Sequence, residues 1–82
     1  MPTVLRVGGH SFLFYSEEGH EPPHIHVRTA EKRAKFWLNP VELVRSWNYN
    51  SSELNEIRRI IEANEQDLLE RWNGYFQQHR QD

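Results

Sequence analysis

The chain has 82 residues, a net charge of −2 and no cysteine. A chain of this length forms one domain that buries about 60–65% of the surface exposed by its unfolded form. Without cysteine it has neither disulfides nor a thiolate metal site. The charge excludes a uniformly basic nucleic-acid-binding protein. No segment approaches the ~20 apolar residues of a membrane span or the apolar run of a signal peptide, so we expect a soluble cytoplasmic protein without a membrane partner.

The N-terminal part of the chain predicts a hairpin. Residues 3–7 and 10–15 are rich in strand-forming residues and are separated by Gly8-Gly9. Two glycines accept the positive φ angles of a tight two-residue turn, so this turn pairs Val7 with His10.

A second hairpin is predicted from residues 24–29 and 34–38, which alternate polar and apolar side chains. The apolar residues of both segments share a face if the turn is centred on Glu31-Lys32. This register sets Arg28 opposite Lys35, a like-charge pair that an anion between the two would relieve.

Two helices are predicted in the second half of the chain. The dipeptide Asn39-Pro40 has the residue types of an N-cap and a first helical position, which predicts a short helix at about 40–48 with Trp47 turned inward. Apolar residues then recur every three or four positions, which predicts a long helix at about 53–76.

These elements predict an α+β domain: a four-stranded, mainly antiparallel sheet with two C-terminal helices packed on one face. The face expected beneath the helices carries Leu5, Val7, Phe12, Phe14, Ile25, Val27, Phe36 and Leu38. The opposite face carries Arg6, Leu13, Tyr15, His24, His26, Arg28, Lys35 and Trp37. No segment remains to cover this second face, and exposed aromatic and cationic side chains are typical of a surface for a ligand or partner.

Three blocks of sequence resemble one known family. They are Pro-Thr-Val-Leu-Arg-Val-Gly-Gly, Phe-Tyr-Ser-x-Glu-Gly-His-Glu-Pro-Pro-His-Ile-His-Val, and Ala-Lys-Phe-Trp-Leu-x-Pro-Val-Glu-Leu. From Pro2 to about Phe76 the chain resembles a family of short bacterial proteins catalogued as domain-of-unknown-function family 4160. The resemblance implies a gene beside that of another small protein, and some such pairs have been taken for toxin–antitoxin modules with this family as the toxin. A small antitoxin-like protein is therefore an expected partner. The motif positions transferred are His20, Glu21, His24 and His26, as candidates.

The histidines of this motif favour two kinds of chemistry. In the first, His20, His24 and His26 bind a divalent metal such as zinc, with Glu18 or Glu21 completing the site. Otherwise no cofactor is expected.

In the second kind of chemistry, the protein is a metal-independent ribonuclease. His26, and next His24, are the candidate catalytic residues, because imidazoles can act as general base and acid near neutral pH. Arg28 and Lys35, with Arg6, are expected to stabilise charge on the phosphate. The rings expected to stack on bases of the RNA are those of Tyr15 and Trp37.

A third interpretation is non-catalytic. In it the histidines lie at a protein–protein interface, either with the antitoxin-like partner or with a second copy of the chain in a homodimer. Histidines at a wet interface need no catalytic role, so the sequence leaves these three interpretations open.

Overall fold

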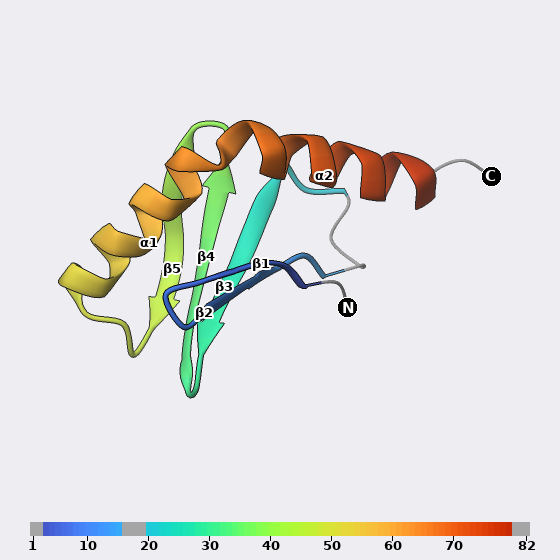
Figure 1. Cartoon of the computed structure of the whole chain (residues 1–82). Coiled ribbons are helices and arrows are strands. Elements are labelled where there is room, and N and C mark those ends of the chain that lie inside the picture. Colours follow the sequence, from blue (N-terminus) through green and yellow to red (C-terminus); the bar gives the residue numbers. More distant parts are fainter. Residues whose placement is uncertain (1–2, 16–19, 80–82) are drawn as a thin grey trace.

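The strands of the sheet follow one another in space in the same order as in the chain (Figure 1). The computed structural model describes residues 3–15 and 20–79. The strands are β1 Thr3–Val7, β2 His10–Leu13, β3 His24–Thr29, β4 Lys32–Leu38 and β5 Val41–Trp47, and the helices are α1 Ser51–Ala63 and α2 Glu65–His79. The α+β class, the antiparallel sheet and the presence of two C-terminal helices are confirmed, but the helices lie at other positions than predicted. The number of strands is five, not four.

The first hairpin has the predicted turn. Val7 pairs with His10 across Gly8-Gly9, whose φ angles are +60° and +81°. These angles suit glycine because a Cβ atom would make them costly. β2 is shorter than predicted and ends at Leu13.

The second hairpin keeps the predicted faces but not the predicted register. β4 begins at Lys32, and the turn consists of Ala30 and Glu31. The pairing is therefore shifted by two residues, so Arg28 lies opposite Arg33, not Lys35. A shift by two leaves every side chain on the same side of the sheet.

The prediction of a helix at 40–48 is wrong, because this segment forms the edge strand β5. Val41–Trp47 pairs antiparallel with β4, and Asn39 and Pro40, joined by a cis peptide bond, lie in the turn before it. Pairing satisfies backbone groups of both strands. It also lets Val41 and Leu43, at alternate positions, pack against the core.

A β-bulge in β5 changes which of its side chains face the core. Leu43 pairs with Phe36, which lies in the core. Arg45 pairs with Lys35, the immediate neighbour of Phe36, so β5 has one extra residue at this point. The bulge therefore sends Arg45 and Trp47 to the face opposite the core. Trp47, expected to be inward, is 69% exposed.

The long helix expected at 53–76 is two helices that meet at Asn64. The Asn64 side-chain amide donates a hydrogen bond of 2.8 Å to the Ile60 carbonyl, and its backbone N–H bonds back into the end of α1. Its own carbonyl accepts from the Leu68 N–H at 2.9 Å, near the start of α2. In Figure 1, α1 runs beside β5, and α2 continues past the end of the sheet where β3 begins.

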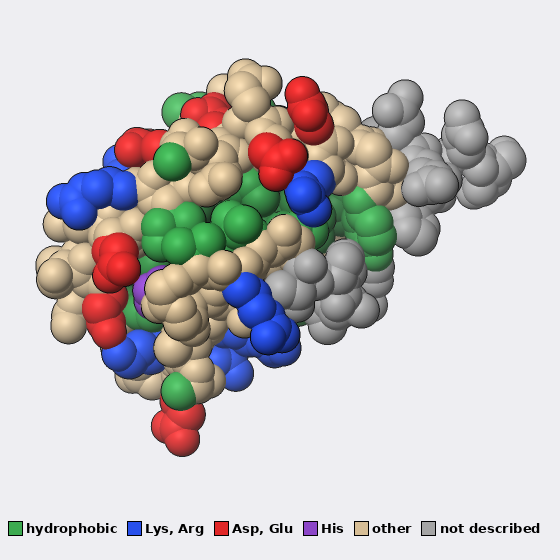
Figure 2. Space-filling view, in the orientation of Figure 1, with side chains coloured by type: hydrophobic (Ala, Val, Ile, Leu, Met, Phe, Trp, Pro, Cys, Tyr) green, Lys and Arg blue, Asp and Glu red, His purple; other side chains and the backbone are tan. Residues whose placement is uncertain are grey.

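The core lies between the sheet and the helices. Six of the eight residues expected beneath the helices are buried there, Leu5 packs against them, and Val7 is 36% exposed. The six are Phe12, Phe14, Ile25, Val27, Phe36 and Leu38. Figure 2 shows a band of hydrophobic side chains between the helices and the first hairpin. Within the described residues, neither helix has the length and apolar character needed to cross a membrane.

Candidate anion-binding face

Three cross-strand rows of side chains lie on the face opposite the core, because residues paired in register point to the same side of a sheet. The first row, from β1 to β5, is Arg6, Ser11, Arg28, Arg33 and Trp47. The second is Leu13, His26, Lys35 and Arg45, and the third is His24, Trp37 and Glu42. We call these three rows the cationic face. They contain five Lys and Arg residues and one carboxylate among the described residues.

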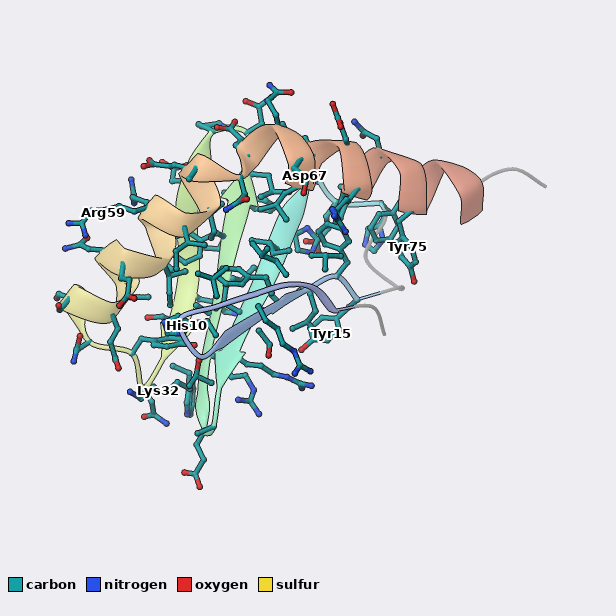
Figure 3. All side chains as sticks on the ribbon, viewed as in Figure 1. His10, Tyr15, Lys32, Arg59, Asp67 and Tyr75 are labelled. Atoms are coloured by element: carbon teal, nitrogen blue, oxygen red, sulfur yellow. The ribbon has the colours of Figure 1, made fainter. Side chains whose placement is uncertain are left out.

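A hollow of about 520 Å³ lies on the cationic face. Its lining residues are Tyr15, His26, Glu31, Arg33, Ala34, Lys35, Arg45, Ser46 and Trp47. This volume falls within the range of small-ligand sites. Figure 3 shows Tyr15 beside the first hairpin, away from α1, whose Arg59 points outward.

His26 is one of the residues that line the hollow. Its imidazole lies 4.1 Å from the Tyr15 ring, measured between ring centroids, with the two rings tilted by 46°, and the residue pairs across the strands with Lys35. The residue is 9% exposed. Tyr15 therefore fixes the imidazole in place beside a cationic side chain.

Lys35 is a cation held in position by two neighbours. Its Nζ donates a 2.7 Å hydrogen bond to Oε1 of Glu21 and lies 5.2 Å above the ring of Trp37. The residue is 5% exposed. Glu21 neutralises part of the positive charge that Lys35 brings to the hollow.

His24, a candidate catalytic residue, is fully buried. Its Nδ1 donates a 2.9 Å hydrogen bond to the Pro22 carbonyl, and its ring lies 4.8 Å from that of Trp72 in α2. A general acid or base has to reach the atom it serves. The expectation that nothing covers this face is therefore wrong at His24, which has a packing role in this structure.

The metal site expected from three histidines is not assembled. His20 is exposed, whereas His24 is enclosed by Trp37 and Trp72. No three His, Cys, Asp or Glu side chains lie close enough to hold a metal ion within residues 3–15 and 20–79. Glu18 lies outside the described residues.

The structure adds three residues to the predicted site: Arg33, Arg45 and Trp47. Arg45 and Trp47 were not among the predicted site residues because their segment, residues 40–48, was expected to form a helix. Alternating Val41 and Leu43 were the available signal for a strand. Arg6 and Arg28, both predicted, are exposed on the first row. Figure 2 shows Lys and Arg side chains along the side of the sheet away from the helices.

Two described residues with shifted pKa values, Tyr49 and Glu53, lie close together in sequence at the start of α1. Hydrogen bonds from the Lys32 side chain and the Asn50 backbone lower the pKa of Glu53 below its usual 4.5. Burial raises the pKa of Tyr49, whose hydroxyl lies 3.2 Å from Thr29 Oγ1 and 3.5 Å from His10 Nδ1. The Tyr49 contacts join the end of β3 and the first hairpin to the segment that precedes α1.

Fold and site together define a small α+β protein with a basic, ligand-sized hollow on the side of its sheet opposite the core. A family model described as "Domain of unknown function (DUF4160)" matches residues 9–73. The chain belongs to this family. No curated protein and no solved structure matches the chain.

Proposed function

We propose that the protein binds RNA through the cationic face and that it acts by this contact as the toxin-like member of a toxin–antitoxin pair. The observation that carries the proposal is the segregation of charge. Five Lys and Arg side chains occupy the cationic face of a chain whose net charge is −2. Proteins that bind single strands combine such a basic surface with aromatic side chains.

The spacing of the cations suits a chain of phosphates. Arg33 and Lys35 lie two positions apart on β4, which places them about 6.6–6.8 Å apart along the strand. Arg45 extends the second row onto β5, beside Lys35. Several phosphates can therefore contact the face at once, and each contact releases counterions from the RNA.

The burial of His24 favours binding over cleavage by paired histidines. Such cleavage needs one imidazole as general base and another as general acid, both in contact with the substrate. His26 is the histidine that lines the hollow, and His24 is enclosed behind it. We therefore propose that the bound RNA is held and not cut.

The test compares two matched double variants. Arg28→Ala/Arg45→Ala removes two cations from the cationic face, and Arg58→Ala/Arg59→Ala removes two from the exposed side of α1. RNA affinity is measured by fluorescence anisotropy over a range of salt concentrations. We expect the first variant to bind more weakly, with a log–log salt slope smaller by about 1.4, because each lost phosphate contact of a single strand contributes ~0.7. The α1 variant should bind as the wild type does.

Expression in a bacterial host tests the toxin-like role. Wild-type protein should slow growth while cellular RNA stays intact, and the Arg28/Arg45 variant should relieve the effect. A wild-type protein that binds no RNA at low salt would contradict the proposal, as would equal losses in both double variants. Loss of a protein partner in the Arg28/Arg45 variant, without any RNA binding, would identify the face as a protein-binding surface.

A further inference from the structure

We propose that the RNA bound by the cationic face is single-stranded and that Trp47 stacks on one of its unpaired bases. This inference rests on the proposed function and specifies its substrate class. It depends on the position of Trp47, on the bulge that places it there, and on the contacts already made by the other aromatic side chains of the face.

Trp47 is the most exposed large hydrophobic side chain among the described residues. It is 69% exposed, and Val7, at 36%, is the other such residue. Burial of a ring of this size usually contributes favourable free energy, and an indole exposed to water does not gain it. The exposed face of the indole is therefore a ready surface for a flat apolar partner.

The β-bulge gives Trp47 its position at the rim of the hollow. If residues 41–47 alternated regularly, Trp47 would lie on the same side of the sheet as Leu43, beneath the helices. With the bulge, Trp47 pairs with Arg33 and lines the hollow together with Arg45. Arg45 and Trp47 lie two positions apart on the same side of β5, so a phosphate held by Arg45 would leave its base near the indole.

Tyr15 and Trp37, the rings expected to stack on bases, are already in contact with neighbouring side chains. Tyr15 lies against His26 at 4.1 Å. Trp37 is only partly exposed, with the Lys35 ammonium over its ring face and the His24 ring in a T-shaped arrangement with it. The stacking role therefore moves to Trp47, which the sequence analysis placed in the core.

Stacking on Trp47 selects unpaired RNA. In a duplex each base is paired and stacked between its neighbours, and the deep major groove of A-form RNA does not admit side chains. A single strand can turn one base outward onto an aromatic ring, a contact of about 1–3 kcal/mol per base. A duplex bound through the same phosphates would gain only the electrostatic part of the binding free energy, without the stacking part.

The experiment uses the full chain and three fluorescent RNA probes of one length. These are a single strand, the same strand annealed to its complement, and a strand with abasic positions throughout. The variants are Trp47→Ala, Trp47→Phe and, as a matched truncation of an exposed apolar side chain, Val7→Ala. Circular dichroism checks that each variant is folded.

The wild type should prefer the single strand to both other probes. Trp47→Ala should bind the single strand about 5- to 150-fold more weakly, the range that corresponds to loss of one stacked base. It should bind the abasic strand as the wild type does. Trp47→Phe should keep most of the affinity, and Val7→Ala all of it.

Two results would overturn the stacking of a base on Trp47 while leaving RNA binding in place. One is equal binding of the single strand by the wild type and Trp47→Ala. The other is an equal loss by Trp47→Ala on the abasic strand, which would show that the indole contacts something other than a base. If the wild type binds none of the three probes, the proposed function itself fails.

Discussion

The ring centroids of His24 and Trp72 lie 4.8 Å apart, which connects the first residue of β3 to the middle of α2. Trp72 also packs against Phe14 and Phe76. His24 is therefore part of the aromatic packing that holds α2 over the end of the sheet. The conspicuous histidine motif thus contains one structural residue, His24, and one residue that lines the hollow, His26.

Replacing His24 should cost stability. His24→Ala removes a fully buried ring and its hydrogen bond to the Pro22 carbonyl. We expect a loss of about 2–4 kcal/mol in the free energy of unfolding, as for other large-to-small core changes. Urea denaturation measures it, with the exposed His20→Ala as control. A His24→Ala protein as stable as the wild type would refute the packing role.

Neutralising Glu21 should strengthen RNA binding. Glu21 accepts the hydrogen bond from Lys35 Nζ, so its carboxylate competes with a phosphate for this cation. Glu21→Gln removes the negative charge, and we expect severalfold tighter binding at low salt, with the difference reduced at high salt. Glu62→Gln, an equal charge change on the exposed side of α1, should have no effect. Weaker binding by Glu21→Gln would show that Glu21 contributes to the site instead of masking it.

The N-cap of α1 offers a test of the fold that is independent of the RNA site. Asn50 Oδ1 accepts a 2.8 Å hydrogen bond from the Glu53 N–H, and Glu53 Oε1 accepts a 2.9 Å bond from the Asn50 N–H. Loss of such a cap costs about 1 kcal/mol. Asn50→Ala should lower the free energy of unfolding by that amount in thermal or urea denaturation, and Asn50→Asp should retain most of it. Equal destabilisation by both would argue against the cap.

Because of Glu53, the free energy of unfolding should decrease at acidic pH. Because its pKa is lower in the folded protein than its usual 4.5, the folded state favours the ionised carboxylate. The resulting stabilisation is present above pH 4.5 and is lost as the pH falls through the lower, folded-state pKa. Glu53→Gln can still complete the capping box but has no charge to lose. The stability difference between wild type and Glu53→Gln should therefore shrink between pH 7 and pH 3. A difference that stays constant over this range would contradict the ion pair of Glu53 with Lys32.

Local signals in the sequence were sufficient for the turn of the first hairpin and for the sides of the sheet in β1 to β4, but the register of the second hairpin is shifted by two residues from the prediction. Gly8-Gly9 defined one turn, and alternation placed His26 and Arg28 opposite the core. The β5 segment was misread because Asn39-Pro40 also suits a turn between strands, and because the bulge breaks the alternation that would reveal a strand. This error hid Arg45 and Trp47, both of which line the hollow.

The burial of side chains was less predictable than their direction. Alternation gives the side of the sheet on which a side chain lies, but not what packs against it. His24 is covered by Trp72, which is distant in sequence, and Lys35 by Glu21 and Trp37. Such contacts depend on where α2 and the β2–β3 connection lie in three dimensions. No short sequence pattern specifies that arrangement.

The most direct test is a titration of ¹⁵N-labelled protein with a single-stranded RNA, followed by NMR amide chemical shifts. We predict that the largest changes fall on β3, β4 and β5 around Arg28, Lys35 and Arg45, with the indole N–H of Trp47 among them. Amides on the exposed side of α1, around Arg58 and Arg59, should not move. Changes centred on the helices, or none at saturating RNA, would contradict RNA binding by the cationic face.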